Sequence, residues 1–283
     1  MTPPQAQSRL YPAAAKAGAQ SAPIRNTEWS KGFVLWVWYP LATLCLIVGI
    51  ALAACYLDGA FDWRYRTLSS LGSASNNPRG YTYCCLGLMV SFSMGLPLCS
   101  YFRVRFEPIA PTAARLSDRS LKIGFLGVVA VGFERLFSQG LALHTYKLHE
   151  YLSVITFFGL LLGIAGFWLC LTRWLLLQRQ WSVWALFGLS LISVGPILGT
   201  GLSQAYLYFI PNDLGWVGPH WAELGVPLYL SFAFWEWLTV FGIFIYLFLI
   251  LLFLPAQIPG PSAAAADIPL RHAARRSDGA NAS

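Results

Sequence analysis

Residues 121–143 read LKIGFLGVVAVGFERLFSQGLAL, an apolar run interrupted in its second half by Glu134 and Arg135. A transmembrane helix needs about 20 predominantly apolar residues, so this segment is long enough to cross a bilayer. A charged side chain at hydrocarbon depth costs at least a few kcal/mol and is usually paired or functional. Glu134 is therefore the first candidate for a functional residue, and it needs a partner.

Five further stretches have the same apolar character, namely 33–57, 80–102, 150–174, 182–208 and 224–254. Hydrophobic residues make up 57% of the chain and charged residues 11%, whereas soluble globular domains are about one quarter charged. The runs are continuous rather than alternating, which argues against a transmembrane barrel. The sequence predicts an all-α fold, a polytopic transmembrane bundle of six helices.

The ends of the chain differ from its middle. Residues 1–30 are rich in Pro, Ala, Gln and Ser and lack the apolar core of a cleaved signal, so the first helix is expected to act as an uncleaved anchor. Residues 255–283 have a similar low-complexity composition. We therefore expect a disordered cytoplasmic arm at 1–30, a six-helix membrane domain at 31–254 and a disordered cytoplasmic tail at 255–283.

The distribution of Lys and Arg predicts orientation. If the N-terminus is cytoplasmic, fourteen of these residues fall on the cytoplasmic side, and only Arg64, Arg66, Arg79 and Lys147 fall on the other. Both termini should then face the cytoplasm, in an endomembrane or plasma membrane, or in the inner membrane of a bacterium. The net charge of +7 reflects this bias and gives no reason to expect nucleic acid as a partner.

The predicted outer face carries most of the polar side chains with chemical potential. Ser69 and Ser70 lie in the first loop, whereas three histidines and two acids lie in or beside the other two loops: His144, His149, Glu150, His220 and Glu223. If they meet above the bundle, these groups can bind zinc, run acid–base chemistry or hold a phosphate. Each histidine taken alone is more often a helix cap or a headgroup contact. The spacing is no recognised metal signature, so no metal site is predicted and the cofactor is left unknown.

Glu134 and Glu236 are the two acids deep in apolar segments. Counted from the expected helix ends at Leu143 and Leu224, both lie roughly 14–18 Å deep, because a helix rises about 1.5 Å per residue. If the two acids lie at the same depth in the membrane, with Arg135 beside them, they can form an ion-pair network or line a polar cavity. A pair that only holds the third and sixth helices together is an equal alternative. Trp237, next to Glu236, is expected to face lipid or pack against other helices, with lining a pocket as the alternative.

The order of several motifs resembles the Frag/DRAM/Sfk family of six-helix membrane proteins, which includes GPI-anchor remodelling factors with a CWH-type N-terminal domain and damage-regulated autophagy modulators. The matching parts are Leu68-Ser69-Ser70-Leu71-Gly72 with Pro78, Glu134, His149-Glu150 and Glu236-Trp237. The resemblance implies remodelling, sensing or trafficking of GPI-type or inositol lipids. It leaves open whether the chain is itself a catalyst.

Three functions remain as hypotheses. The first is a lipid-handling protein with a membrane lipid as its ligand, in which His149, Glu150, Ser69 and Ser70 are the candidate catalytic residues. Its candidate binding residues are Glu134, Arg135, Glu236, Trp237, His144, His220 and Glu223. The second is a scaffold or trafficking factor that binds a protein partner through the basic loop Arg103–Lys122. The third, a proton-coupled transporter built on Glu134 and Glu236, is disfavoured because no inverted repeat is visible.

Overall fold

The structure is a computed structural model that describes residues 29–59, 61–137, 148–177, 183–209, 225 and 227–254. Within these ranges all regular elements are helices. Most of the predicted N-terminal arm and all of the predicted C-terminal tail lie outside them. The fold described below is that of the part beginning at Lys31.

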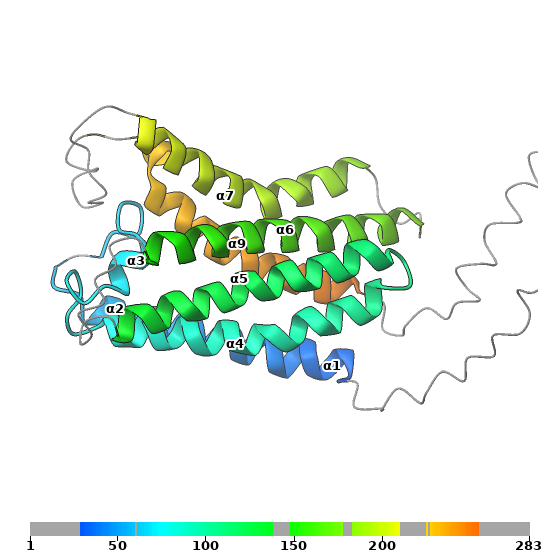
Figure 1. Cartoon of the computed structure of the whole chain (residues 1–283), viewed down its shortest axis with the longest axis horizontal. Coiled ribbons are helices and arrows are strands. Elements are labelled where there is room, and N and C mark those ends of the chain that lie inside the picture. Colours follow the sequence, from blue (N-terminus) through cyan, green and yellow to red (C-terminus); the bar gives the residue numbers. More distant parts are fainter. Residues whose placement is uncertain are drawn as a thin grey trace, which may run out of the picture. The chain divides into compact units, whose positions relative to one another are not determined.

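Long helices form this part of the molecule (Figure 1). The first is continuous from α1 (Lys31–Phe33) through a π-helical turn, η1 (Val34–Trp38), into α2 (Tyr39–Cys55). The wide turn precedes Pro40, which cannot donate to the carbonyl four residues before it. The other long helices are α4 (Tyr81–Phe106), α5 (Pro111–Phe137), α6 (Leu148–Leu177), α7 (Val183–Phe209) and α9 (Phe232–Phe253), and short ones are α3 (Leu68–Leu71) and η2 (Leu228–Leu230).

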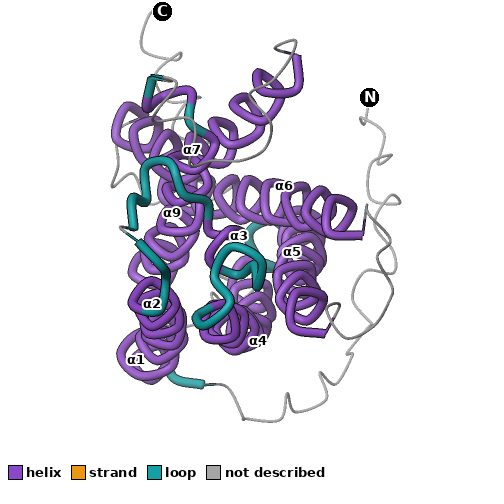
Figure 2. Tube along the Cα trace, turned by 90° about the vertical axis from the view of Figure 1, so that its left-hand side faces the viewer, coloured by secondary structure: helices purple, strands orange, loops and turns teal. Residues whose placement is uncertain are grey.

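Long helices that follow one another in the chain pack side by side, and the last helix, α9, contacts both the first helix and the later ones. α2 packs on α4, α4 on α5 and α5 on α6, while α9 contacts η1, α6 and α7, as the end-on view in Figure 2 shows. Aromatic side chains fill the centre, where Phe92 of α4 meets both Phe125 of α5 and Phe244 of α9 edge-on. Tyr246 adds a hydrogen bond from its hydroxyl to the Ile164 carbonyl oxygen at 2.6 Å.

The α5–α6 pair is the most extensive helix contact, and small residues make it possible. A Cβ placed on Gly159 would lie 2.5 Å from the backbone nitrogen of Gly124, and one on Gly163 would lie 2.6 Å from Leu121. Between membrane helices, small residues allow the backbones to approach closely and so maximise van der Waals contact. This packing holds the middle of α5 against the middle of α6.

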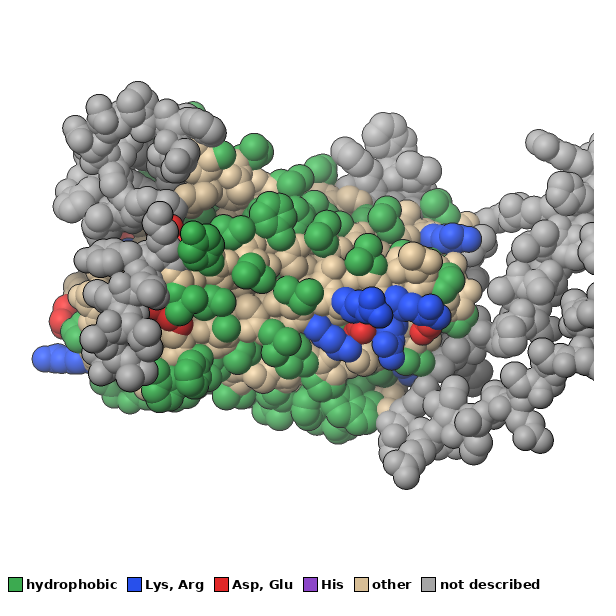
Figure 3. Space-filling view, in the orientation of Figure 1, with side chains coloured by type: hydrophobic (Ala, Val, Ile, Leu, Met, Phe, Trp, Pro, Cys, Tyr) green, Lys and Arg blue, Asp and Glu red, His purple; other side chains and the backbone are tan. Residues whose placement is uncertain are grey.

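Four helices in the described ranges are long and apolar enough to cross a membrane: Lys31–Cys55, Tyr81–Phe106, Leu148–Leu176 and Phe232–Phe253. Large apolar side chains also face outward, for example Trp36 and Leu202, each 71% exposed. Figure 3 shows hydrophobic side chains along the length of one face, with charged groups gathered towards the ends. The described part of the molecule is thus all-helical and suited to integration in a membrane.

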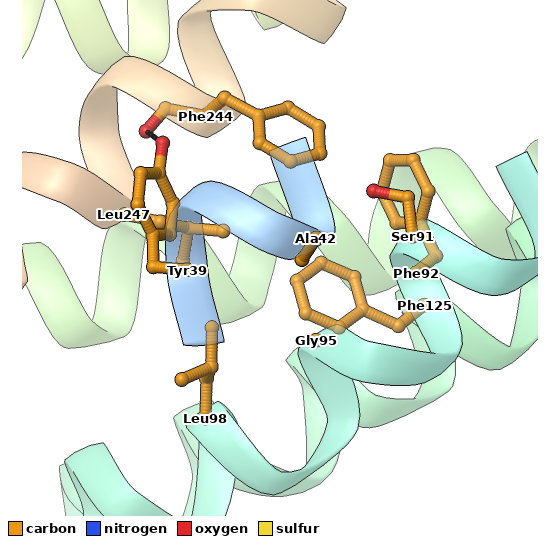
Figure 4. Close-up of a pocket in the computed structure, with 9 residues that line it drawn as sticks. All are labelled: Tyr39, Ala42, Ser91, Phe92, Gly95, Leu98, Phe125, Phe244 and Leu247. Atoms are coloured by element: carbon orange, nitrogen blue, oxygen red, sulfur yellow. Dashed lines mark hydrogen bonds between the residues drawn. The ribbon is translucent and has the colours of Figure 1, made fainter. Parts of the chain in front are cut away.

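One small cavity lies in the core (Figure 4). Nine residues of α2, α4, α5 and α9 line it: Tyr39, Ala42, Ser91, Phe92, Gly95, Leu98, Phe125, Phe244 and Leu247. Its volume is about 10 Å³, room for roughly one water molecule. The cavity is therefore too small to hold a lipid or a cofactor.

Candidate functional site

The first loop folds over the beginning of α4 through a short helix, α3. Thr67 caps this helix, since its hydroxyl oxygen accepts a hydrogen bond from the Ser70 backbone nitrogen at 3.0 Å. The Ser69 hydroxyl donates to the Thr67 hydroxyl at 3.0 Å, and the Ser70 hydroxyl donates to the Thr67 carbonyl oxygen at 2.7 Å. Both serines therefore take part in the local hydrogen bonding of a helix start, the role in which Ser and Thr are most often found.

Asn77 fastens the other side of the loop. Its side chain is fully buried, and its amide nitrogen donates to the carbonyl oxygens of Ala53 at 2.9 Å and Leu71 at 3.2 Å. Its amide oxygen accepts from the backbone nitrogen of Gly80 at 3.1 Å. A single buried amide thus joins the end of α2, the end of α3 and the beginning of α4. The sequence analysis did not identify Asn77, because only its turn-forming neighbour Pro78 gave a signal.

The start of α9 holds the same loop from the opposite side through three side chains. Glu236 Oε2 accepts from the backbone nitrogen of Leu68 at 2.7 Å. Trp237 Nε1 donates to the Arg66 carbonyl oxygen at 2.7 Å, and the Ser231 hydroxyl donates to the Arg64 carbonyl oxygen at 2.6 Å. These bonds join residues more than 160 positions apart in the sequence. The Leu68–Gly72 motif and the Glu236-Trp237 motif are therefore parts of one structural unit.

Cys84 and Cys85, in the first turn of α4, lie beneath α3. The Cys84 thiol is 4.0 Å from the Leu68 carbonyl oxygen, and the Cys85 thiol is 3.5 Å from the Gly72 carbonyl oxygen. The Leu68 backbone also bonds to Glu236, and the Cys85 carbonyl oxygen lies against Gly132 of α5, two residues before Glu134. The first turn of α4 therefore lies between the α9 acid and the charged end of α5.

The second polar group is formed by Glu134, Arg135 and His149. Glu134 Oε2 lies 3.6 Å from Arg135 Nε and 3.7 Å from His149 Nδ1. These separations exceed a good hydrogen bond, and among the described residues Glu134 Oε2, Arg135 Nε and His149 Nδ1 are buried without a hydrogen-bond partner. We call these three residues the Glu134 cluster. It brings together an acid, a cation and an imidazole from two adjacent helices, with hydrogen-bonding capacity left over.

The cluster has a fixed place because α5 is held by its neighbours. Two residues before Glu134, a Cβ on Gly132 would lie 3.3 Å from the Cys85 carbonyl oxygen and 2.7 Å from the Met89 side chain. On the α6 side, a Cβ on Gly127 would clash with Thr156. The backbone that carries Glu134 is thus packed tightly between α4 and α6.

At the rim of the first loop, Asp62 and Arg64 form an ion pair. Arg64 Nε and Nη2 each donate to the Asp62 carboxylate at 2.9 Å, and the Arg64 backbone nitrogen donates at 3.1 Å. The hydrogen bond from the Arg64 side chain lowers the pKa of Asp62 from its ordinary value. Both side chains are exposed, so the pair orders the rim and contributes little to stability.

Two predictions about the acids are changed by the structure. α9 begins at Phe232 rather than Leu224, so Glu236 lies one turn from its helix end and not 14–18 Å deep. Glu236 bonds to the backbone of α3, and no ion pair in the described residues joins it to Glu134 or Arg135. The depth calculated for Glu134 depended on Leu143, which lies outside the described residues.

The remaining candidates are placed as follows. Glu150 is exposed at the beginning of α6, and Trp237 is 2% exposed with its ring against Phe61. His144, His220 and Glu223 lie outside the described residues. The predicted contact of His149 with these three side chains is therefore not described.

No protein-family model matches this chain, and no curated protein or solved structure matches it either.

Proposed function

We propose that the chain is an integral membrane protein of six spanning helices that takes part in lipid remodelling, sensing or trafficking, and that it binds a lipid head group at the Glu134 cluster. The observation that supports this is the unsatisfied hydrogen-bonding capacity of the cluster. A buried polar group without a partner costs about 1–3 kcal/mol, so a site with three such atoms is stabilised by a polar ligand. In a membrane, lipid head groups are the most abundant ligands of this kind.

The three side chains offer complementary chemistry to a head group. Arg135 donates to a phosphate oxygen in a charge-assisted hydrogen bond. His149 donates or accepts according to its protonation, and Glu134 accepts from a hydroxyl of a sugar or inositol. An imidazole beside a carboxylate is also a pair that can move a proton, since loose geometry in an empty site often tightens when the substrate binds.

The resemblance to the Frag/DRAM/Sfk family supports the lipid class, GPI-type or inositol lipids. The motifs that carry it lie in two places: Glu134 and His149 form the cluster, and the Leu68–Gly72 and Glu236-Trp237 motifs position the loop beside it. We assign Ser69 and Ser70 to helix capping rather than to nucleophilic attack, because both hydroxyls donate to Thr67.

The test is to measure lipid composition in cells that express wild type, His149→Ala or Tyr151→Phe. Tyr151 is the matched control, since it is 62% exposed and begins the same helix. We expect His149→Ala to change one class of acylated lipid at unchanged membrane level, and Tyr151→Phe to resemble wild type. Unchanged lipids in His149→Ala and in Glu134→Gln, both well expressed, would overturn the proposal.

A scaffold that recruits a protein through Arg103–Lys122 is the alternative, and the structure offers it less support. Three of the five cations in this segment bind acids of the same segment: Arg103 and Lys122 approach Asp118, and Arg115 pairs with Glu107. Neutralising Arg119 should abolish function under the scaffold hypothesis and preserve it under the lipid-handling one.

A further inference from the structure

A second charged region lies at the other end of the bundle, and the proposed function does not use it. α4 contains 26 residues, which corresponds to about 39 Å of helix. A hydrocarbon core is about 30 Å thick, so a helix of this length reaches the head-group region. α4 begins at Tyr81, beside the first loop, and its last turn carries Arg103 and Arg105. Figure 3 shows Lys and Arg side chains gathered towards one end of the molecule. The two regions therefore belong to opposite membrane faces.

Arg105 is the unusual residue of this region, because it is a buried cation. It is 4% exposed, its guanidinium carbon lies 3.7 Å from the centre of the Tyr101 ring, and its Nε has no hydrogen-bond partner among the described residues. Stacking on an aromatic ring offsets part of the cost of burying the charge. It provides no hydrogen-bond acceptor, however, and a buried charge without a counter-charge is strongly destabilising.

A second cation, Lys31, increases this cost. Lys31 is close enough for the Arg105 charge to repel its own. The Lys31 ammonium donates to the carbonyl oxygens of Leu252 at 2.9 Å and Leu254 at 2.6 Å, at the end of α9. These carbonyls supply only the partial negative charge of a helix C-terminus.

The acids of this region are already used by other cations. Asp118 lies 2.8 Å from Lys122 and 3.5 Å from Arg103, and Glu107 lies 2.6 Å from Arg115. Within the described residues, no carboxylate pairs with Arg105 or Lys31. Among the described residues, Lys31 of α1 and Arg105 of α4 are therefore two cations without a paired carboxylate.

From this we infer that Arg105 and Lys31 form a site for the phosphate of an anionic membrane lipid, on the opposite face from the Glu134 cluster. A lipid fits better than a soluble anion because exposed apolar side chains lie near Lys31. Trp36 follows Lys31 by five residues along the same helix, and the Leu252 carbonyl oxygen accepts a hydrogen bond from Lys31. Trp36 of η1 is 71% exposed and Leu252 of α9 is 43% exposed, so acyl chains can lie along them while the phosphate reaches the cations. Tryptophan is enriched at membrane–water interfaces, where lipid phosphates lie.

The experiment uses the purified full chain in detergent, melted with and without dioleoyl phosphatidylglycerol, and native mass spectrometry to count bound lipids. At a lipid concentration ten times its Kd, the melting temperature of wild type should rise by about 3–6 °C. Arg105→Met should lose this rise and bind at least about five times less lipid. Without lipid it should melt at or above wild type, because the substitution removes an uncompensated buried charge.

The controls separate the alternatives. Arg115→Met removes a cation of the same region that is already paired with Glu107, and it should respond to phosphatidylglycerol as wild type does. Arg105→Lys keeps the charge and should keep part of the response, which provides a test if Arg105→Met fails to fold. Four results would overturn the inference: an equal rise in Arg105→Met, an equal rise with phosphatidylcholine, a full rise with inorganic phosphate alone, or a lipid-independent fall in the melting temperature of Arg105→Met with its lipid response intact.

Discussion

Glu236 is one of the residues that hold the first loop in position. Replacing it with Ala leaves the backbone nitrogen of Leu68 without its acceptor at 2.7 Å. An unsatisfied donor at a partly buried site costs about 1–3 kcal/mol. We expect Glu236→Ala to lower the melting temperature by several degrees, measured by tryptophan fluorescence of the purified chain.

Glu236→Gln is the matched control for this substitution. It keeps an oxygen that accepts the hydrogen bond, in nearly the same volume, so its melting temperature should lie between those of wild type and Glu236→Ala. If both variants melt as wild type does, the acid does not hold the loop, and its position near the motif of the first loop has another cause.

The ion pair between Asp62 and Arg64, at the rim of that loop, predicts a small pH dependence of the melting temperature. Arg64 lowers the pKa of Asp62 in the folded state. The stabilisation is therefore fully present above the unfolded pKa of about 3.9 and is lost as the pH falls through the lower folded value. The difference in melting temperature between wild type and Asp62→Asn should be small at pH 7 and vanish well below pH 4. A difference that grows on acidification would contradict this.

At the scale of elements, the packing of α5 on α6 makes opposite predictions for two glycines. Gly159 lies against the Gly124 backbone, whereas a Cβ on Gly195 of α7 meets nothing within 4 Å. Ala is favoured over Gly inside a helix by about 0.5–1 kcal/mol, but overpacking costs about 1–3 kcal/mol. Gly195→Ala should raise the melting temperature slightly, and Gly159→Ala should lower it. Equal shifts in both variants would show that α5 and α6 are further apart.

The helix bounds show which elements hydropathy can find. The apolar run 150–174 predicts α6 (Leu148–Leu177) closely, because that helix is apolar on all sides. The run 121–143 misses the first ten residues of α5, which begins at Pro111. Arg115, Asp118 and Arg119 make the beginning of this helix too polar for a hydropathy criterion. Asp118 and Arg115 are each in an ion pair, and the side that packs inward is formed largely by Ser117, Asp118 and Ser120.

α9 shows the opposite error. The run 224–254 is apolar apart from Glu236 and a few hydroxyl residues, yet the helix begins only at Phe232. Gly225 has a φ of +67°, and Pro227 precedes a short 3-10 turn, so both residues interrupt the helix without lowering the hydropathy. This difference of eight residues is the reason that the predicted depth of Glu236 was wrong.

Part of the candidate site could be predicted from the sequence. Glu134 and His149 stand out in the sequence because charged and imidazole groups are rare in apolar segments, and the structure brings them within 3.7 Å. The bonds from α9 to the first loop give no local signal. They go to backbone atoms, and any sequence that folds into the loop supplies those atoms.

On the scale of the whole molecule, the two ends of the bundle differ in charge. The end where α4 meets α5 carries Arg103, Arg105, Arg115, Arg119 and Lys122. The end with the first loop carries Arg64, Arg66 and Arg79 beside the acids Asp58 and Asp62. The positive-inside rule predicts that the first of these ends is cytoplasmic. On that prediction the Glu134 cluster faces the outer or lumenal side, as the lipid-handling proposal requires.

Labelling with a membrane-impermeant maleimide tests this orientation. R79C lies at an exposed loop position and R119C at an exposed position on α5, and wild type gives the background from its own exposed Cys55. In intact cells, or in sealed vesicles whose outer surface is the non-cytoplasmic face, R79C should react at once and R119C only after permeabilisation. The reverse pattern would move the Glu134 cluster to the cytoplasmic leaflet, and its lipid ligand would then have to be sought there.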